Sequence, residues 1–252
     1  MAKKKTSSPS ITTKTAVIAL LKEHQDDRGI THWQRMSAEK RSGMKSYGVG
    51  LTILRKLAKQ IGRNSKLAAT LWKSDVYEAR VIALLIDDPK SMTPEQAEAQ
   101  VDELGAGMLA HVFASCDATL AKTPFAFDLV LRWQQHDDPM RRRCAYGLIY
   151  ELSKKKSTGR LAGMDDAWCL ACIAKIQKDI HGEDMWVRES MLTALMGLGK
   201  RNPILNDAGI AGAKEIGPVD IDYGPDNACE PLDVLKHLTS DYLQKKMDSM
   251  RG

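Results

Sequence analysis

The sequence contains no long run of apolar residues. Its longest ones, such as residues 16–21 and 81–86, are far shorter than the roughly 20 residues that span a bilayer. The basic N-terminus is not followed by an apolar region with a small-residue cleavage site, which argues against a secretory signal. The five cysteines are an odd number without disulfide-like spacing, as is typical of a reducing compartment. We therefore expect a cytoplasmic protein of bacterial type with no membrane partner.

Signatures of metal and cofactor binding are scarce too. The sequence has no GxxxxGK[ST], GxGxxG, HExxH or GxSxG pattern, which leaves nucleotide, zinc-protease and serine-hydrolase sites unsupported. The pair Cys169-x-x-Cys172 lies within an apolar helical segment, where core packing is the better explanation. The acidic loop that begins at Asp220 has its glycine misplaced for calcium and carries Pro231 at the twelfth position. The sequence therefore predicts no metal and no cofactor.

Helical periodicity dominates the remaining sequence, and almost no segment alternates with a period of two. Thr93-Pro94 and Asp138-Pro139 are typical helix starts. The predicted helices cover residues 12–24, 33–41, 48–62, 64–73, 76–87, 93–104, 106–115, 118–123, 125–136, 139–155, 165–181, 185–200, 203–216 and 231–247. The predicted fold class is all-α.

One phrase recurs within these helices: an acidic residue is followed five positions later by an arginine. The copies are Asp75…Arg80, Asp138…Arg143 and Glu183…Arg188. Such repetition indicates an array of antiparallel helix pairs, a curved α-solenoid or α-α superhelix, which presents a concave surface. We expect a disordered basic tail over 1–10, a single repeat domain over 11–252 with an irregular loop at 217–231, and a monomer.

Two helices carry unusual residues opposite their apolar stripes. In 139–152 the second face holds Arg143, Tyr146, Gly147 and Tyr150, and in 186–199 it includes Trp186 and Thr193, with Lys200 following on the same side. A solvent face would be rich in Lys and Glu, so aromatics beside cations indicate a contact surface. Packing of Tyr146 and Trp186 against a neighbouring repeat explains the pattern equally well.

Cations also cluster along the chain. The clusters are Arg55, Lys56, Lys59 and Arg63; Arg141, Arg142 and Arg143; Lys154, Lys155, Lys156 and Arg160; and Lys200 and Arg201. Several of these cations lie at helix ends, where they also complement the helix dipole. If they share one concave face, they would follow a phosphate backbone, by shape and charge more than by base readout.

With these features together, the chain resembles the DNA alkylation repair glycosylases of the AlkD type, which are built from HEAT-like repeats. The resemblance covers roughly residues 45–216. The segments that carry it are YGVGLTILRKL (47–57), LWKSDVYEARVIAL (71–84), SCDATLAKTPFAFDLVLRW (115–133), HDDPMRRRCAYGL (136–148) and GLGKRNP (197–203). It implies a HEAT-like solenoid that holds duplex DNA in its groove and excises cationic alkylated purines without a metal.

The resemblance also assigns an acid and an arginine by motif position. The acid that supports the sugar cation falls on Asp117, in CDATL, and the phosphate-gripping arginine falls on Arg143, ten residues after Trp133. From the residues alone, Asp117 could instead cap a helix over 118–122. Arg143 could be a surface arginine that pairs with a neighbouring repeat.

The aromatic positions of the family are not kept. The aromatic four residues before the acid is Phe113, and the second aromatic position falls on Thr193. Trp186 lies two turns earlier on the same helix face. If one helix runs through Phe113 and Asp117, the two are one turn apart. These departures weaken the case for catalysis more than the case for DNA binding.

Two functions remain open at this stage, with a third less favoured. An alkylated purine is already a good leaving group, so one carboxylate beside the developing oxocarbenium ion and a water would suffice for excision. Asp117 would be catalytic. The DNA contacts would come from Phe113, Arg143, Tyr146, Tyr150, Lys154, Lys155, Trp186, Thr193, Lys200 and Arg201. The alternatives are a non-catalytic protein that binds damaged or branched DNA, and a protein–protein scaffold.

Overall fold

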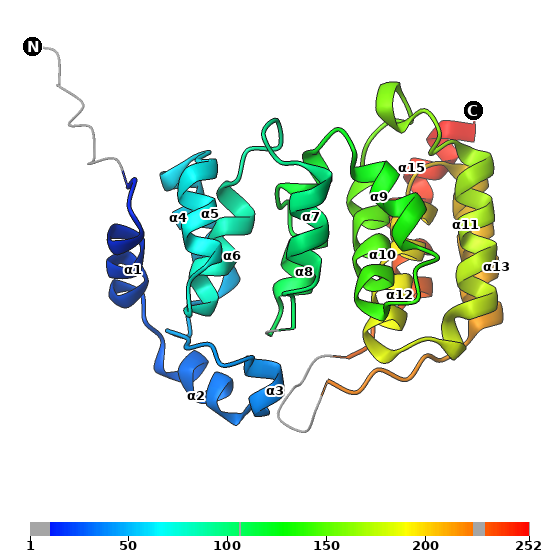
Figure 1. The fold of residues 1–252 in the computed structure, drawn as a ribbon. Helices are drawn as coiled ribbons and strands as arrows, with labels where there is room; N and C mark the ends of the chain where they lie inside the picture. The colour runs from blue at the N-terminus through cyan, green and yellow to red at the C-terminus, as the bar shows by residue number, and fades with distance from the viewer. Residues whose placement is uncertain (1–10, 106, 224–229, 252) are drawn as a thin grey trace, which may run out of the picture. The chain divides into compact units, whose positions relative to one another are not determined.

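The computed structural model describes residues 11–105, 107–223 and 230–251 of the chain (Figure 1). The chain forms two compact units. Unit 1 comprises Met1–Phe113 and Asp117–Leu120, and unit 2 comprises Ala114–Cys116 and Ala121–Gly252. Across the described residues the regular secondary structure is helical, apart from one isolated β-bridge between Lys45 and Val76. The all-α prediction is confirmed. Among the helices described, none combines the length and apolar character that a bilayer crossing requires.

Unit 1 is built from short helices whose first turns are fixed by side-chain caps. They are α1 (Lys14–Glu23), α2 (Asp27–Arg35), α3 (Ala38–Arg41), α4 (Leu51–Ile61), α5 (Ser65–Trp72), α6 (Tyr77–Ile86), α7 (Pro94–Val101) and α8 (Leu109–Ala114), whose last residue belongs to unit 2. Thr13, Asp26 and Asn64 each accept a hydrogen bond from a backbone N–H in the first turn that follows, where no helical carbonyl is available. α6 packs against both α4 and α5 and buries Ile82 completely, so it forms the centre of unit 1.

Unit 2 is organised around a pair of long helices, α10 and α12, that lie side by side (Figure 1). Its elements are α9 (Ala126–Trp133), α10 (Pro139–Ser153), η2 (Gly159–Leu161), α11 (Asp166–Asp179), η3 (Ile180–Gly182), α12 (Met185–Gly199), α13 (Pro203–Ile216), α14 (Val234–Leu238) and α15 (Asp241–Arg251). A Cβ at Gly197 would lie 2.6 Å from the Ser153 hydroxyl oxygen, so the close approach of these two helices requires glycine there. Arg142 closes the other end with hydrogen bonds of 2.9 and 2.7 Å from Nε and Nη2 to the Glu183 carboxylate.

Three predicted helices differ in kind from those observed, since two are divided and one is reduced to a single turn. The segment 33–41 is split, since α2 already begins at Asp27 and Ser37 accepts from the Lys40 N–H to start α3. The segment 231–247 is divided into α14 and α15, where the Thr239 hydroxyl donates to the Leu235 carbonyl at 2.8 Å. The segment 118–123 contains only one 3-10 turn, η1 (Leu120–Lys122).

The predicted domain limits concern the two ends of the chain and the loop near its C-terminus. Residues 1–10, predicted to be a disordered tail, lie outside the described residues. Residues 217–223 and 230–233 contain no helix or strand, and 224–229, which complete the loop expected over 217–231, are also outside them. A single repeat domain over 11–252 remains a prediction.

Candidate nucleic-acid interface

A basic pocket lies in unit 2, where the C-terminal ends of α10 and α12 meet α15. We call it the basic pocket, with a volume of about 600 Å³. Its lining consists of Tyr150, Ser153, Lys154, Lys155, Lys156, Ser157, Gly197, Lys200, Arg201, Asn202, Lys246 and Met250. Five predicted DNA contacts, which come from two separate stretches of the sequence, are therefore neighbours: Tyr150, Lys154, Lys155, Lys200 and Arg201.

Hydrogen bonds to backbone carbonyls hold two of these cations in place. Arg201 Nη1 donates to the carbonyls of Ser153 at 2.9 Å and Lys155 at 3.0 Å, and its Nη2 donates to Ser157 Oγ at 2.6 Å. Lys155 Nζ donates to the Ala121 carbonyl at 2.7 Å. These acceptors are neutral, so they do not cancel the positive charges of Arg201 and Lys155. Arg201 therefore fixes the turn after α10 while it adds to the positive charge of the pocket.

The other lysines of the pocket differ in exposure, since Lys154 and Lys246 are exposed and Lys200 is half-buried. Lys154 lies 4.0 Å from the centre of the Tyr150 ring and forms an ion pair of 2.9 Å with Glu151. Burial and the charge of Lys154 together lower the pKa of the Lys200 amino group. Lys246, on the exposed side of α15, reaches the Lys200 carbonyl at 3.5 Å. An anion placed here would relieve the repulsion between these ammonium groups.

A second cationic feature of unit 2 is the buried guanidinium of Arg143. It is only 7 % exposed, and its Nε and Nη2 atoms have no hydrogen-bond partner. The guanidinium carbon lies 4.8 Å from the centre of the Trp186 ring, which also contacts the Tyr223 ring at 6.0 Å. Desolvation lowers the pKa of Arg143 and raises that of Glu189 nearby, while the attraction between the two charges opposes both shifts. Arg143 thus places a positive charge in a site that does not satisfy all of its hydrogen-bond donors.

Some residues predicted to contact DNA are buried instead. Tyr146 is 0 % and Phe113 1 % exposed, so neither side chain offers a surface to a ligand. The prediction that this side of α10 is a contact surface is wrong at Tyr146 and Gly147, because other residues pack against α10 on that side as well. A Cβ at Gly147 would lie 2.8 Å from the Ala114 Cβ. Half-buried Thr193 uses its hydroxyl to donate to the Glu189 carbonyl at 3.1 Å.

Asp117 is an exposed residue in the turn after α8. α8 ends at Ala114, so the helix expected to connect Phe113 with Asp117 does not run through both. Cys116 and Asp117 both have left-handed backbone angles, with φ of 56° and 62°. Non-glycine residues in this region cost roughly 1–3 kcal/mol each, and such strain is typical of functional turns. Asp117 belongs to unit 1 and Arg143 to unit 2, so their convergence stays a prediction.

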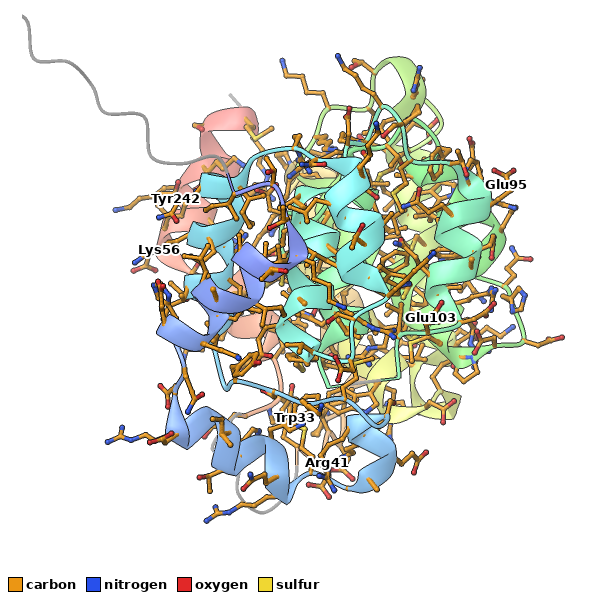
Figure 2. The ribbon with its side chains drawn as sticks, turned by 60° about the vertical axis from the view of Figure 1, so that its left-hand side comes forward. Trp33, Arg41, Lys56, Glu95, Glu103 and Tyr242 are labelled. Carbon is orange, nitrogen blue, oxygen red and sulfur yellow. The ribbon has the colours of Figure 1, made fainter. Side chains whose placement is uncertain are left out.

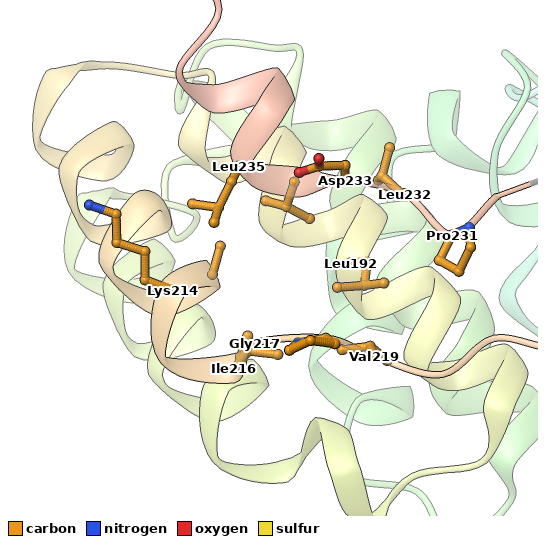
Figure 3. A pocket seen from close by; sticks show the side chains of 12 residues that line it. Leu192, Lys214, Ile216, Gly217, Val219, Pro231, Leu232, Asp233 and Leu235 are labelled. Carbon is orange, nitrogen blue, oxygen red and sulfur yellow. The ribbon is translucent and has the colours of Figure 1, made fainter.

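A second pocket of unit 2 contrasts with the basic pocket. It has a volume of about 460 Å³ between the end of α13 and the start of α14. Figure 3 shows apolar side chains such as Leu192, Ile216 and Leu235 around it, with the polar groups of Lys214 and Asp233 near its edge. These labelled residues do not bring several charges of one sign together. The second pocket is therefore not part of the candidate interface.

The cysteine pair of α11 lies in the core of unit 2. Cys169 and Cys172 are buried, and desolvation raises the pKa of their thiols to about 11 and about 12. A thiol of this kind is a poor nucleophile and a poor metal ligand. In the described part of the chain, no group of three or more His, Cys, Asp and Glu residues could hold a metal ion. The acidic loop lies partly outside that range, over 224–229.

Comparison with known proteins identifies the family. A family model described as "DNA alkylation repair enzyme" matches residues 17–210. The chain belongs to the DNA alkylation repair enzyme family. No curated protein matches this family member. A solved structure described as "A new family of proteins related to the HEAT-like repeat DNA glycosylases with affinity for branched DNA structures" matches with a TM-score of 0.74 and 21% sequence identity, over 94% of each chain. The predicted HEAT-like fold is therefore confirmed.

The family match also divides the basic pocket into two parts. Tyr150, Lys154 and Lys200 of this alkylation repair family member lie within the matched residues, whereas Lys246 and Met250 come from α15, which follows them. Sequence reasoning missed Lys246 as a site residue. The one available signal was the Lys245-Lys246 pair in an otherwise mixed helix, and no local pattern places that pair beside Lys200.

Proposed function

We propose that this chain binds DNA through the phosphate backbone, and that the basic pocket of unit 2 is its principal contact. The observation that carries the proposal is the meeting of Lys154, Lys200 and Lys246 in one solvent-open pocket. Lysine is a strong phosphate binder. When a lysine neutralises a phosphate, counterions are released from the DNA, so the binding depends on salt. The lowered pKa of Lys200 supports an anionic ligand, since a phosphate would favour its charged form.

The chemistry of the pocket favours recognition of shape and charge over base sequence. Its cations suit phosphate oxygens, and the Tyr150 ring offers a stacking surface that tolerates any base. Asn202, which could read a base edge, is engaged with the Asp166 carboxylate at 2.9 and 3.0 Å. The related family described as having affinity for branched DNA supports including a four-way junction among the substrates tested.

The test is the salt dependence of binding, measured by fluorescence anisotropy with a labelled duplex and a four-way junction. For three phosphate contacts, the logarithm of the binding constant should fall against that of salt with a slope of about −3. Lys246→Ala should reduce that slope by about 1. Lys214→Ala on the exposed side of α13 is the matched control and should leave it unchanged. A slope near zero, or equal slopes for both variants and the wild type, would contradict the proposal.

Excision of alkylated purines is a second candidate, favoured by Asp117. This residue is exposed in a strained turn, at the motif position of the family's acid. Incubation with duplex DNA that carries 7-methylguanine tests this function by base release, beside Asp117→Asn. We expect the variant to lose about 100-fold or more in rate if Asp117 stabilises the sugar cation. Absence of release by the wild type would eliminate excision and leave backbone binding as the function.

A further inference from the structure

Unit 1 contains a pocket of a different character from the basic pocket. We call it the aromatic pocket. It lies among α2, α4, α6 and α8 and has a volume of about 380 Å³, within the range of small-molecule sites. The residues that define it are Trp33, Tyr77, Glu78, Val81, Met108 and His111. No residue of unit 2 contributes to this lining.

The most unusual feature of the aromatic pocket is the carboxylate of Glu78, which is only 1 % exposed. Its Oε1 accepts hydrogen bonds from Ser46 Oγ at 2.6 Å and the Val49 N–H at 3.2 Å. Its Oε2 is buried and has no hydrogen-bond partner. An unsatisfied buried carboxylate oxygen is costly. A ligand N–H that enters the pocket would supply the missing donor.

Two aromatic rings are held rigidly in the same pocket. Trp33, on α2 (Figure 2), and Tyr77 have ring centres 4.7 Å apart at an angle of 35°. Trp33 Nε1 donates to the Met44 carbonyl at 3.3 Å, and the Tyr77 hydroxyl accepts from the Met108 N–H at 3.3 Å. These bonds fix both rings, so a planar ligand can stack without reordering them.

Glycine keeps space beside those rings. Gly107 has a φ of +50°, and a Cβ there would lie 3.0 Å from Trp33 and 3.1 Å from Tyr77. Any other residue would strain the backbone and press on both rings. Val81 and the 40 % exposed Met108 complete an apolar wall. The pocket therefore combines a stacking surface, an apolar wall and the unsatisfied acceptor of Glu78.

We propose that the aromatic pocket binds a planar heteroaromatic ring with an exocyclic amino group, of the size of a single nucleobase. The ring stacks against the fixed aromatic pair and its amino group donates to Glu78 Oε2. This inference goes beyond the DNA-binding function, because the pocket belongs to the other unit and its acceptor carries the opposite charge to the lysines. Failure of either proposal leaves the other intact.

Two nucleosides that differ only in the amino group provide the direct test. Adenosine carries it and purine riboside lacks it. Titration calorimetry of the full chain should detect adenosine with at least about tenfold higher affinity than purine riboside, as expected for a hydrogen bond to a charged group. Equal affinities, or no binding of adenosine at millimolar concentration, would overturn the proposal.

Substitutions locate the binding. Met108→Trp should fill the pocket and abolish adenosine binding. Leu131→Trp, at a residue 46 % exposed in unit 2, adds the same indole elsewhere and should leave adenosine binding unchanged. Glu78→Gln should remove the preference for adenosine, since its amide nitrogen would face another donor. Adenosine binding that survives Met108→Trp would overturn the assignment, even if Glu78→Gln fails to fold.

Discussion

The basic pocket of unit 2 and the aromatic pocket of unit 1 are both formed between helices, yet they differ in the charge and burial of their polar groups. The first is lined by exposed or half-buried lysines, of which Lys154 and Lys200 lie at helix C-termini, whereas the second has a carboxylate that is 1 % exposed. Cations at helix C-termini are stabilised by the carbonyl ends and can stay in water. The Glu78 carboxylate lies in the first turn of α6 but is desolvated there and must find donors. The difference shows that the charge and burial of the lining side chains determine which ligand chemistry each pocket can offer.

The largest effect that would distinguish the two pockets is reversal of charge in the basic pocket. Lys200→Glu with Lys246→Glu should weaken binding to duplex DNA at least about 100-fold at low salt, because two phosphate contacts become repulsive. The measurement is anisotropy of a labelled duplex. Lys214→Glu with Lys236→Glu makes the same change of charge at two exposed lysines of unit 2 that do not line the basic pocket. That control should stay within about threefold of the wild type, and equal losses in both pairs would refute the assignment.

The next largest effect concerns the stability of two adjacent arginines. Arg143→Met should raise the free energy of unfolding by about 1 kcal/mol, because it removes a buried charge with two unsatisfied atoms. Arg142→Met should lower it by about 2 kcal/mol, because it breaks the ion pair with Glu183 at 2.7 Å. Urea unfolding measures both. A destabilising Arg143→Met would mean that the Trp186 contact outweighs the cost of burial.

A smaller effect links DNA affinity to pH through Lys200. Burial lowers the pKa of its amino group, so the charge is present below that pKa and is lost as pH rises through it. DNA affinity should then fall roughly threefold to tenfold in the alkaline range, as one phosphate contact is neutralised. Lys200→Arg keeps its charge throughout and should flatten the profile. An unchanged profile in that variant would remove Lys200 from the contact.

The smallest predicted effect is at Glu189. Its pKa is raised by burial in the folded state, so its ionised form costs stability above the ordinary carboxyl pKa, and the cost disappears when the group is protonated in both states at low pH. Glu189→Gln should therefore raise the melting temperature by about 1–2 °C near neutral pH and by less near pH 4. Thermal unfolding at the two pH values gives the comparison. A rise in melting temperature that is larger near pH 4 than near neutral pH would contradict this explanation.

Sequence periodicity predicted the fold well because helix signals are local. Thr93 and Asp138 cap α7 and α10 as their Pro-containing starts indicate. Periodicity could identify the apolar side of α10, but not that Ala114 covers the other side at Gly147. For the same reason Tyr146 was expected at a surface and is buried. A single helix pattern does not say what packs on its second face.

The candidate sites depend on long-range neighbours, and the sequence predicted them unevenly. The clusters at Lys154 and Lys200 were visible as charge runs, and their meeting required the pairing of α10 with α12. Lys246 joins them from α15, and Glu78 meets Ser46 across 32 residues. Neither pairing leaves a local trace in the sequence. Chemistry-bearing residues could be recognised in the sequence, but their partners could not.

Amide hydrogen exchange of the full chain, with and without saturating duplex DNA, tests the central claim most directly. Bound DNA should slow exchange at residues 154–157, at 200–202 and in α15, which together surround the basic pocket. Residues 216–219 and 231–235, around the apolar pocket of unit 2, should exchange as before. Protection confined to segments other than those of the basic pocket would contradict the account.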